Sequence, residues 1–231
     1  MDFLENKFFL LAITFGAFMC SKILQNRTGW VILNPILLAI AILICFLNVS
    51  GVSYDTYIEA GSLVEFWLKP AVVALGVPLY LQLRMIRKQL IPILVSQLAG
   101  CVVGLVSVAL IAKLLGATPE VIMSLAPKSV TTPIAMEVSS SVGGIPSLTA
   151  AVVIVVGLFG AICGFKVLQV GRVGSPIAQG LSMGTATHAV GTSRAMEVSG
   201  KYGAYAGLGL TLNGILTALL SPAILRMLGL Y

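Results

Sequence analysis

The chain has 231 residues, of which 58% are apolar and only 10% are charged. A soluble domain carries about a quarter charged residues, so this composition excludes an ordinary water-exposed surface and predicts an all-α polytopic membrane protein. The mean hydropathy of +1.04 agrees with lipid as the solvent, and the net charge of +6 indicates membrane orientation rather than a nucleic-acid partner. We expect a single transmembrane domain over residues 1–231.

About six apolar runs are long enough to cross a hydrocarbon layer of roughly 30 Å. In chain order they cover residues 8–24, 30–47, 66–83, 90–115, 146–167 and 204–227. The acidic start, MDFLENK, lacks a basic region, so we interpret the first run as a retained helix and not as a signal peptide. The four cysteines lie inside apolar runs without metal-ligand spacing, so we expect no metal and no cofactor.

Two further segments, about 118–143 and 176–202, are apolar but interrupted. Each contains a short helical stretch, a cluster of Pro, Gly, Ser and Thr, and a second short stretch that ends at glycine. At an offset of 60, ten of the 21 positions from 123 to 143 are identical in 183 to 203, and the letters AMEVS occur in both. The sequence therefore predicts an internal repeat of an interrupted segment plus a long helix, with units of about 118–167 and 176–227.

The distribution of Lys and Arg predicts how the interrupted segments lie in the membrane. With Arg84, Arg87 and Lys88 inside, two re-entrant segments place eight basic residues inside and four outside. If both segments crossed instead, Lys166 and Arg172 would move outside and the count would be six against six. The re-entrant interpretation makes the repeats inverted, and inverted repeats with interrupted helices near the midplane are typical of secondary transporters.

The two breaks, APKSVTTP and ATHAVGTS, predict an anion site. An interrupted helix persists in a bilayer only where protein or a water-lined cavity covers its free backbone groups. Thr132 is a good N-cap, and Pro133 is a good first helical residue. The second copy would restart from Thr192 or Ser193. Two helix N-termini that face one cavity would attract a carboxylate.

Ionisable side chains in these segments strengthen that prediction, because charges inside a membrane are costly and usually functional. Lys128 lies in the first break, and the single histidine, His188, occupies the matching position of the second. Histidine titrates near neutral pH, so His188 could also carry a proton. The predicted substrate-binding residues are Lys128, Ser129, Thr131, Thr132, His188, Gly191, Thr192, Ser193 and Arg194. The predicted ion- or proton-coupling residues are His188, Glu197 and Glu137.

Structural roles compete with each of these assignments. The two glutamates could form ion pairs with Arg194 or Lys201 near the membrane interface. Lys128 could extend its ammonium group to the surface, and His188 could be a satisfied polar group in a helix bundle. Threonine and serine at helix breaks are more often caps than ligands. Asn213, on the last apolar run, could join helices by hydrogen bonds.

The stretches LAPKSVTTPIAM, GGIPSLTAAVVIVVGLFGA and GLSMGTATHAVGTSRAMEV together resemble the LrgB/CidB family. NVSGVSYDTY and LKPAVVALGVPLY are similar to that family too, so the resemblance covers nearly the whole chain. It implies a bacterial inner-membrane protein that acts as an antiholin-like effector of murein hydrolase export and autolysis. It also implies a smaller membrane partner of the LrgA/CidA type. A plant chloroplast relative is a glycolate/glycerate translocator, and bacterial members are linked to pyruvate uptake.

The resemblance also implies site residues. The motif positions of the family fall on Lys128, Thr131, Thr132, His188, Gly191 and Glu197. At Glu137 the chain departs from the family, where that position is often small or apolar, so Glu197 is the favoured coupling residue.

We therefore predict a secondary transporter or facilitator for small monocarboxylates, of the glycolate or pyruvate kind, in the bacterial inner membrane. The sequence contains no phosphate loop, HExxH motif or nucleophile elbow, so we do not expect an enzyme. The alternative is an antiholin-like regulator that assembles with a small LrgA/CidA-type membrane protein. The expected partners are thus a small organic anion, that membrane protein and the lipid bilayer, and the sequence leaves a homo-oligomer open.

Overall fold

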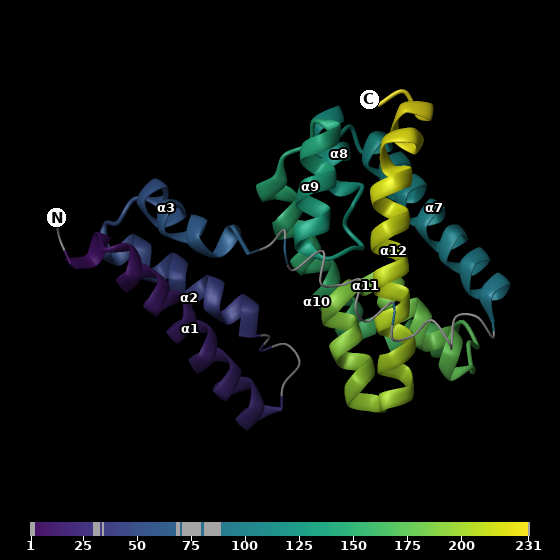
Figure 1. Cartoon of the computed structure of the whole chain (residues 1–231), viewed down its shortest axis with the longest axis horizontal. Coiled ribbons are helices and arrows are strands. Elements are labelled where there is room, and N and C mark those ends of the chain that lie inside the picture. The colour runs from purple at the N-terminus through teal and green to yellow at the C-terminus, as the bar shows by residue number, and fades with distance from the viewer. Residues whose placement is uncertain are drawn as a thin grey trace. The chain divides into compact units, whose positions relative to one another are not determined.

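The computed structural model describes residues 3–29, 33, 35–67, 70, 80 and 89–230. These residues form nine α-helices and one short 3-10 helix, and they contain no β-strand (Figure 1). The prediction of an all-α chain is confirmed for this described part. The chain divides into two compact units, Met1–Ala71 and Val72–Tyr231.

The first unit contains three α-helices that follow a single 3-10 turn. They are η1 (Phe3–Glu5), α1 (Lys7–Thr28), α2 (Pro35–Ser50) and α3 (Tyr54–Glu65). The side chain of Asn6 caps α1 by accepting the backbone N–H of Phe8, and α1 ends at Gly29 in the left-handed region. Ser53 caps α3 in the same way by accepting the N–H of Thr56. The stretch between the second and third predicted apolar runs therefore contains a capped helix.

The second unit contains six α-helices, three of which are long. They are α7 (Leu90–Leu114), α8 (Pro119–Leu125), α9 (Thr132–Val142), α10 (Pro146–Val170), α11 (Pro176–Val198) and α12 (Gly200–Met227). The long helices α7, α10 and α12 have 25, 25 and 28 residues and are apolar enough to cross a membrane. At 1.5 Å per residue even the shorter two reach about 38 Å, which exceeds the hydrocarbon thickness of roughly 30 Å.

Four of the six predicted membrane spans are present as apolar helices of sufficient length. They are α1, α7, α10 and α12, for the predicted runs 8–24, 90–115, 146–167 and 204–227. α12 begins four residues early because Ser199 caps it by accepting the N–H of Tyr202. The second predicted span is the 16-residue helix α2. The third, and the basic cluster behind the predicted orientation, lie mostly outside the described residues.

The first predicted interruption is present, and the chain reverses direction there. α8 ends at Leu125 and α9 begins at Thr132. The backbone N–H of Ile145, just beyond α9, donates to Ser124 Oγ in α8 at 2.7 Å. The chain beyond α9 has therefore returned to the C-terminal end of α8, so α8, the connection 126–131 and α9 fold back on themselves; we call this segment the first hairpin and residues 126–131 its tip.

The second predicted interruption is a reversal at a single residue. His188 has φ 44° and ψ −139°, which is not helical, and it divides α11 into two halves. A Cβ atom on Gly191 would lie 3.2 Å from the carbonyl oxygen of Met183, eight residues earlier. Eight residues of straight helix would span about 12 Å, so the second half of α11 folds back on the first half.

Two predicted helix starts differ from the observed ones. α9 is capped by Thr131 and not by Thr132, which is already its first helical residue. The second copy restarts directly after His188 and not from Thr192 or Ser193. Both hydroxyls donate to the carbonyl oxygen four residues earlier, which is how these residues behave inside a helix and not at its N-cap.

The first half of α11 packs against α12 through glycines, with the two backbones nearly touching. A Cβ atom on Gly180 would lie 2.7 Å from the carbonyl oxygen of Tyr202. Gly184 lies one turn after Gly180 on α11, and it faces Ala206, which lies one turn after Tyr202 on α12. These two stretches therefore run parallel. From the other side, a Cβ atom on Gly209 of α12 would lie 2.5 Å from the carbonyl oxygen of Leu181, so small residues on both helices allow this close packing. This packing brings the first half of α11 and the middle of α12 together at the cavity described next.

Candidate functional site

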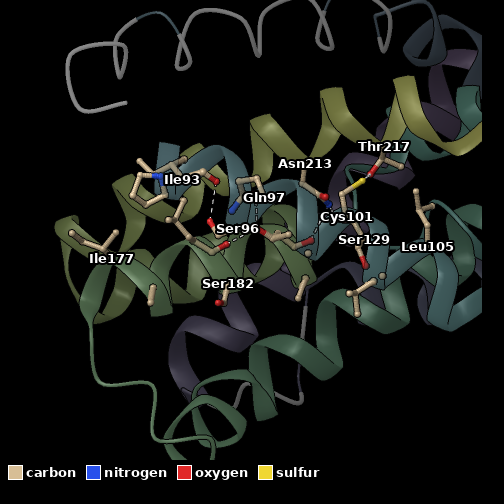
Figure 2. Close-up of a pocket in the computed structure, with 18 of the residues that line it drawn as sticks. Ile93, Ser96, Gln97, Cys101, Leu105, Ser129, Ile177, Ser182, Asn213 and Thr217 are labelled. Carbon is tan, nitrogen blue, oxygen red and sulfur yellow. Dashed lines mark hydrogen bonds between the residues drawn. The ribbon is translucent and has the colours of Figure 1, made fainter. Parts of the chain in front are cut away.

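A cavity of about 680 Å³ lies within the second unit. Its wall comes from α7, the tip of the first hairpin, the first half of α11 and α12. Many apolar residues line it, and a set of polar side chains is gathered among them (Figure 2). The polar lining residues used below are Gln97, Lys128, Ser129, Ser182, Thr185 and Asn213.

Lys128 places a positive charge on the wall of this cavity. It is half-buried in the tip of the first hairpin, and its Nζ donates to Ser129 Oγ at 3.0 Å. Among the residues that the structure describes, no carboxylate lies within 4 Å of Nζ; the two ion pairs there join other residues. Lys128 and Ser129 are therefore the predicted substrate-binding residues that the structure brings to a cavity, and Lys128 offers an ammonium group without a counter-charge.

Asn213 ties the first hairpin to α11 from the middle of α12. Its side-chain Nδ2 donates to the carbonyl oxygen of Ser129 at 3.2 Å and to that of Thr185 at 2.9 Å. The Thr185 hydroxyl in turn donates to Gln97 Oε1 on α7 at 2.7 Å. The sequence-based alternative of Asn213 as a contact between helices is thus observed, and the same residue also lines the cavity.

Two buried polar atoms near the first hairpin tip have no hydrogen-bond partner within the described part of the chain. They are Asn213 Oδ1 and Thr131 Oγ1. Thr131 is the N-cap of α9, but its hydroxyl makes no capping bond. A buried acceptor without a partner costs about 1–3 kcal/mol, and such atoms often mark a place where a ligand or water binds.

His188 is fastened to α10 and does not line the cavity. The residue is 4% exposed, and its Nε2 lies 2.8 Å from the carbonyl oxygen of Val153. A carbonyl oxygen only accepts, so Nε2 carries the hydrogen in this contact. Gly157 leaves room for the ring, since a Cβ atom there would lie 2.5 Å from His188 Cε1.

Gly191, Thr192 and Ser193 of the second break make contacts within α11 and do not line the cavity. Gly191 packs against the Thr187 side chain. Thr192 and Ser193 donate to backbone carbonyls within α11. Along with Thr131 and Thr132 of the first hairpin, none of them belongs to the cavity wall.

The predicted coupling glutamates lie at the surface of the second unit. Arg194 Nη1 contacts Glu197 Oε2 at 2.6 Å, and these side chains are 40% and 62% exposed. Glu137 is also exposed. The observed pairing of Arg194 with Glu197 is the structural alternative that the sequence left open. The coupling roles of His188, Glu197 and Glu137 stay predictions.

Each of the two interrupted segments is bonded to the long helix that follows the other one. The first hairpin is bonded to α12 through Asn213, and the second break is bonded to α10 through Val153. Val153 and Asn213 are themselves 60 residues apart, the same offset as the two copies of the repeat. The sequence signal that would have found Asn213, Gln97 and Thr185 is a polar side chain inside an apolar run, and for Asn213 it was present but ambiguous.

The family model described as the LrgB-like family matches residues 14–227 of this chain. The chain belongs to the LrgB-like family. Relatives in the family align with nearly the whole length. An uncharacterised protein of Haemophilus influenzae is 38% identical over 216 residues, which is 94% of each chain.

Two further relatives are similarly close. The holin-like protein CidB of Staphylococcus epidermidis is 35% identical, over 94% of this chain and 95% of its own. The uncharacterised protein YwbG of Bacillus subtilis is also 35% identical, over 94% of this chain and 97% of its own. No solved structure matches the chain.

Proposed function

We propose that the chain is a secondary transporter or facilitator for small monocarboxylates, of the glycolate or pyruvate kind, in the bacterial inner membrane. The observation that carries this proposal is Lys128, a half-buried cation on the wall of a cavity with no carboxylate within 4 Å among the described residues. Charged groups at membrane depth are costly and are kept for ligands, ions or partners. A small carboxylate in this cavity would supply the missing counter-charge.

The neighbouring groups suit such an anion. The Ser129 hydroxyl already bonds Lys128 Nζ and would accompany it toward a carboxylate oxygen. Ser182 adds a hydroxyl to the wall, and the remaining lining is largely apolar. An apolar cavity with a few convergent polar groups is the usual form of a small-molecule site. The cavity volume of about 680 Å³ leaves room for a two- or three-carbon acid together with water.

The repeat supports alternating access as the transport mechanism. We propose that the units 118–167 and 176–227 are inverted with respect to the membrane, so that each hairpin enters from one side. Transporters of this construction expose a central site to each side in turn. In this proposal the second break, with His188, Gly191, Thr192, Ser193 and Arg194, would face the substrate in the other conformation, and His188 with Glu197 would carry the coupling proton.

Reconstitution of the purified protein into vesicles tests the proposal. Uptake of labelled glycolate or pyruvate is expected for the parent protein and is expected to be lost in Lys128→Gln, which keeps the length of the side chain but removes its charge. Lys113→Gln is the matched control, because Lys113 is an exposed lysine near the end of α7 and outside the cavity. No uptake by the parent protein, or equal uptake by both variants, would refute transport at this cavity.

A second function is favoured by the names of relatives. Staphylococcal members are called holin-like, and we infer for this chain an alternative role as a regulator of murein hydrolase export that acts with a smaller LrgA/CidA-type membrane protein. That role predicts a stable complex with the smaller protein after co-expression and purification. It also predicts no vesicle uptake, and a lysis phenotype that Lys128→Gln leaves unchanged.

A further inference from the structure

The cavity that holds Lys128 begins at the exposed ends of two helices. Gln89 is the N-cap of α7 and Ser175 is the N-cap of α11. Both residues are exposed, and both line the cavity. From these ends the lining continues along one face of each helix, at intervals of three or four residues. The starts of α7 and α11 therefore lie at one mouth of the cavity.

Small side chains line the passage from this mouth toward Lys128. Ser96 lines it on α7, and Ser182 lines it on α11. Figure 2 shows these two serines between Ile177 at one end of the lining and Leu105 at the other. Because serine is small, these positions leave room between the two helices.

The hydrogen bonds of the hairpin tip show how deep Lys128 lies. Asn213 Nδ2 donates to the carbonyl oxygen of Ser129, which follows Lys128, and to that of Thr185 on α11. Thr185 is ten residues beyond Ser175, which is about 15 Å along a helix. An anion that enters at the mouth would therefore travel about half of the roughly 30 Å hydrocarbon layer before it reaches the cation.

The opposite end of the cavity is closed by packed apolar side chains. Leu105, the last residue of α7 that lines the cavity, belongs to a buried apolar cluster with Ala109 of α7, Ile122 of α8 and Leu225 of α12. Each of these last three is at most 1% exposed. α7 continues beyond Leu105 for nine residues, or about 14 Å, none of which lines the cavity. A packed apolar constriction of this kind blocks water and ions.

We propose that this cavity is the open access path to Lys128 from the membrane side on which α7 begins, and that the apolar cluster around Ala109, Ile122 and Leu225 is the closed gate toward the other side. This inference rests on the proposed function. A transporter that works by alternating access exposes its site to one side at a time, which requires one open path and one closed barrier. The predicted orientation places Arg172 on the inner side, so the path opens to that side.

Cysteine labelling from each side of the membrane tests the path. Ser96→Cys and Ser182→Cys are made separately in a chain whose four native cysteines are replaced. Right-side-out and inside-out vesicles without substrate are treated with an impermeant, anionic methanethiosulfonate. Arg172→Cys and Lys113→Cys, at exposed residues before α11 and near the end of α7, mark the two sides. We expect both serine positions to react at least roughly tenfold faster from the Arg172 side, because the other route crosses the packed cluster.

Ala109→Cys is the matched control for the gate. Ala109 is also a small residue of α7, but it is 0% exposed and lies within the cluster. We expect this variant to react from neither side.

A second comparison reports whether the path leads to the cation. Lys128→Gln should slow the anionic reagent at Ser182→Cys by roughly two- to sixfold, as for the loss of one unit charge about 10 Å away in a partly aqueous cavity. A cationic methanethiosulfonate should not be slowed. Equal effects of Lys128→Gln on the two reagents would show that the path does not lead to the charge.

The outcomes separate this inference from the proposed function. Reaction of the serine positions from the Lys113 side, equally from both sides or from neither side overturns the inference. Reaction of Ala109→Cys as fast as these positions also overturns it, because the gate would then be absent. If labelling is as expected but the parent vesicles take up no glycolate or pyruvate, transport is wrong while the path stands. If uptake depends on Lys128 but labelling contradicts the path, only this inference is wrong.

Discussion

The contact between Gly184 of α11 and α12 leaves no room for a side chain, so Gly184→Ala should move the two helices apart. A Cβ atom there would lie 2.7 Å from the carbonyl carbon of Ala206 and 2.8 Å from the backbone nitrogen of Leu210, and closer still to the Ala206 carbonyl oxygen. The neighbours are backbone atoms and have no rotamer to change. Ordinary van der Waals contact begins at 3.4 Å, so the helices must separate by at least about 0.7 Å.

That separation is enough to break the bond that positions Asn213. The distance from Nδ2 to the Thr185 carbonyl oxygen would grow from 2.9 Å to about 3.6 Å, beyond a real hydrogen bond. Overpacking costs about 1–3 kcal/mol, and the lost bond about 1 kcal/mol. Alanine has a higher helix propensity than glycine, and this offsets the destabilisation by about 1 kcal/mol. We expect a net loss of about 2 kcal/mol in the free energy of unfolding.

Denaturation in mixed micelles, followed by circular dichroism of the helices, measures this loss. Gly104→Ala is the matched control, because a Cβ atom on Gly104 of α7 would meet nothing within 4 Å. We expect this control to be as stable as the parent protein, or more stable by up to about 1 kcal/mol. Equal stability of Gly184→Ala and Gly104→Ala would show that the close packing of α11 on α12 is wrong.

Three further predictions follow from the second break and from the connections. Gly157→Ala should lower the free energy of unfolding, because the added methyl group collides with the His188 ring. The same substitution should lower it less in a His188→Ala background. Equal losses in the two backgrounds of this double-mutant cycle would contradict the contact. Glu197→Gln should change the free energy of unfolding by no more than about 1 kcal/mol, because its ion pair is largely exposed, whereas abolished vesicle uptake in the same variant would assign the coupling role. In a chain with the native cysteines replaced, single cysteines at Arg172 and Lys201 should react with an impermeant thiol reagent from one side of the membrane and a cysteine at Lys113 from the other; labelling of Arg172 and Lys201 from opposite sides would refute the re-entrant second segment.

The long helices were predictable from the sequence because length and apolar composition decide them locally. α7 and α10 begin at the predicted residues, Leu90 and Pro146. The start of α10 was predictable because proline is favoured at the first position of a helix. The interruptions were also predictable, because clusters of Pro, Gly, Ser and Thr weaken a helix wherever they fall inside an apolar run. The exact cap residues were not, since several hydroxyl residues stand next to one another at each break, and which of them caps depends on how the chain turns back.

The cavity could not be predicted from the sequence, because it depends on which helix faces meet. Its defining bonds join Thr185 to Gln97 and Asn213 to Ser129, across 88 and 84 residues of chain. In a soluble protein the apolar stripe of each helix would indicate the buried face. In an apolar helix surrounded by lipid, both faces carry the same residue types and that signal is absent. Single polar residues within apolar runs were therefore the available guide.

The repeated sequence AMEVS has similar packing in its two copies. The polar residues of the candidate site that the next sentences compare lie at positions where the two copies differ. Ala135 and Ala195 are both fully buried, each in a small apolar cluster, whereas the glutamate of each copy is exposed. Among the matched positions that differ are Lys128 against His188 at the breaks and Asn213 against Val153 on the long helices. At the first break this difference provides a cation and a carboxamide on the cavity wall; at the second it provides a ring bonded to a backbone carbonyl. The two copies thus share their buried alanines and differ at these two matched positions, so the repeat does not give the two breaks the same chemistry.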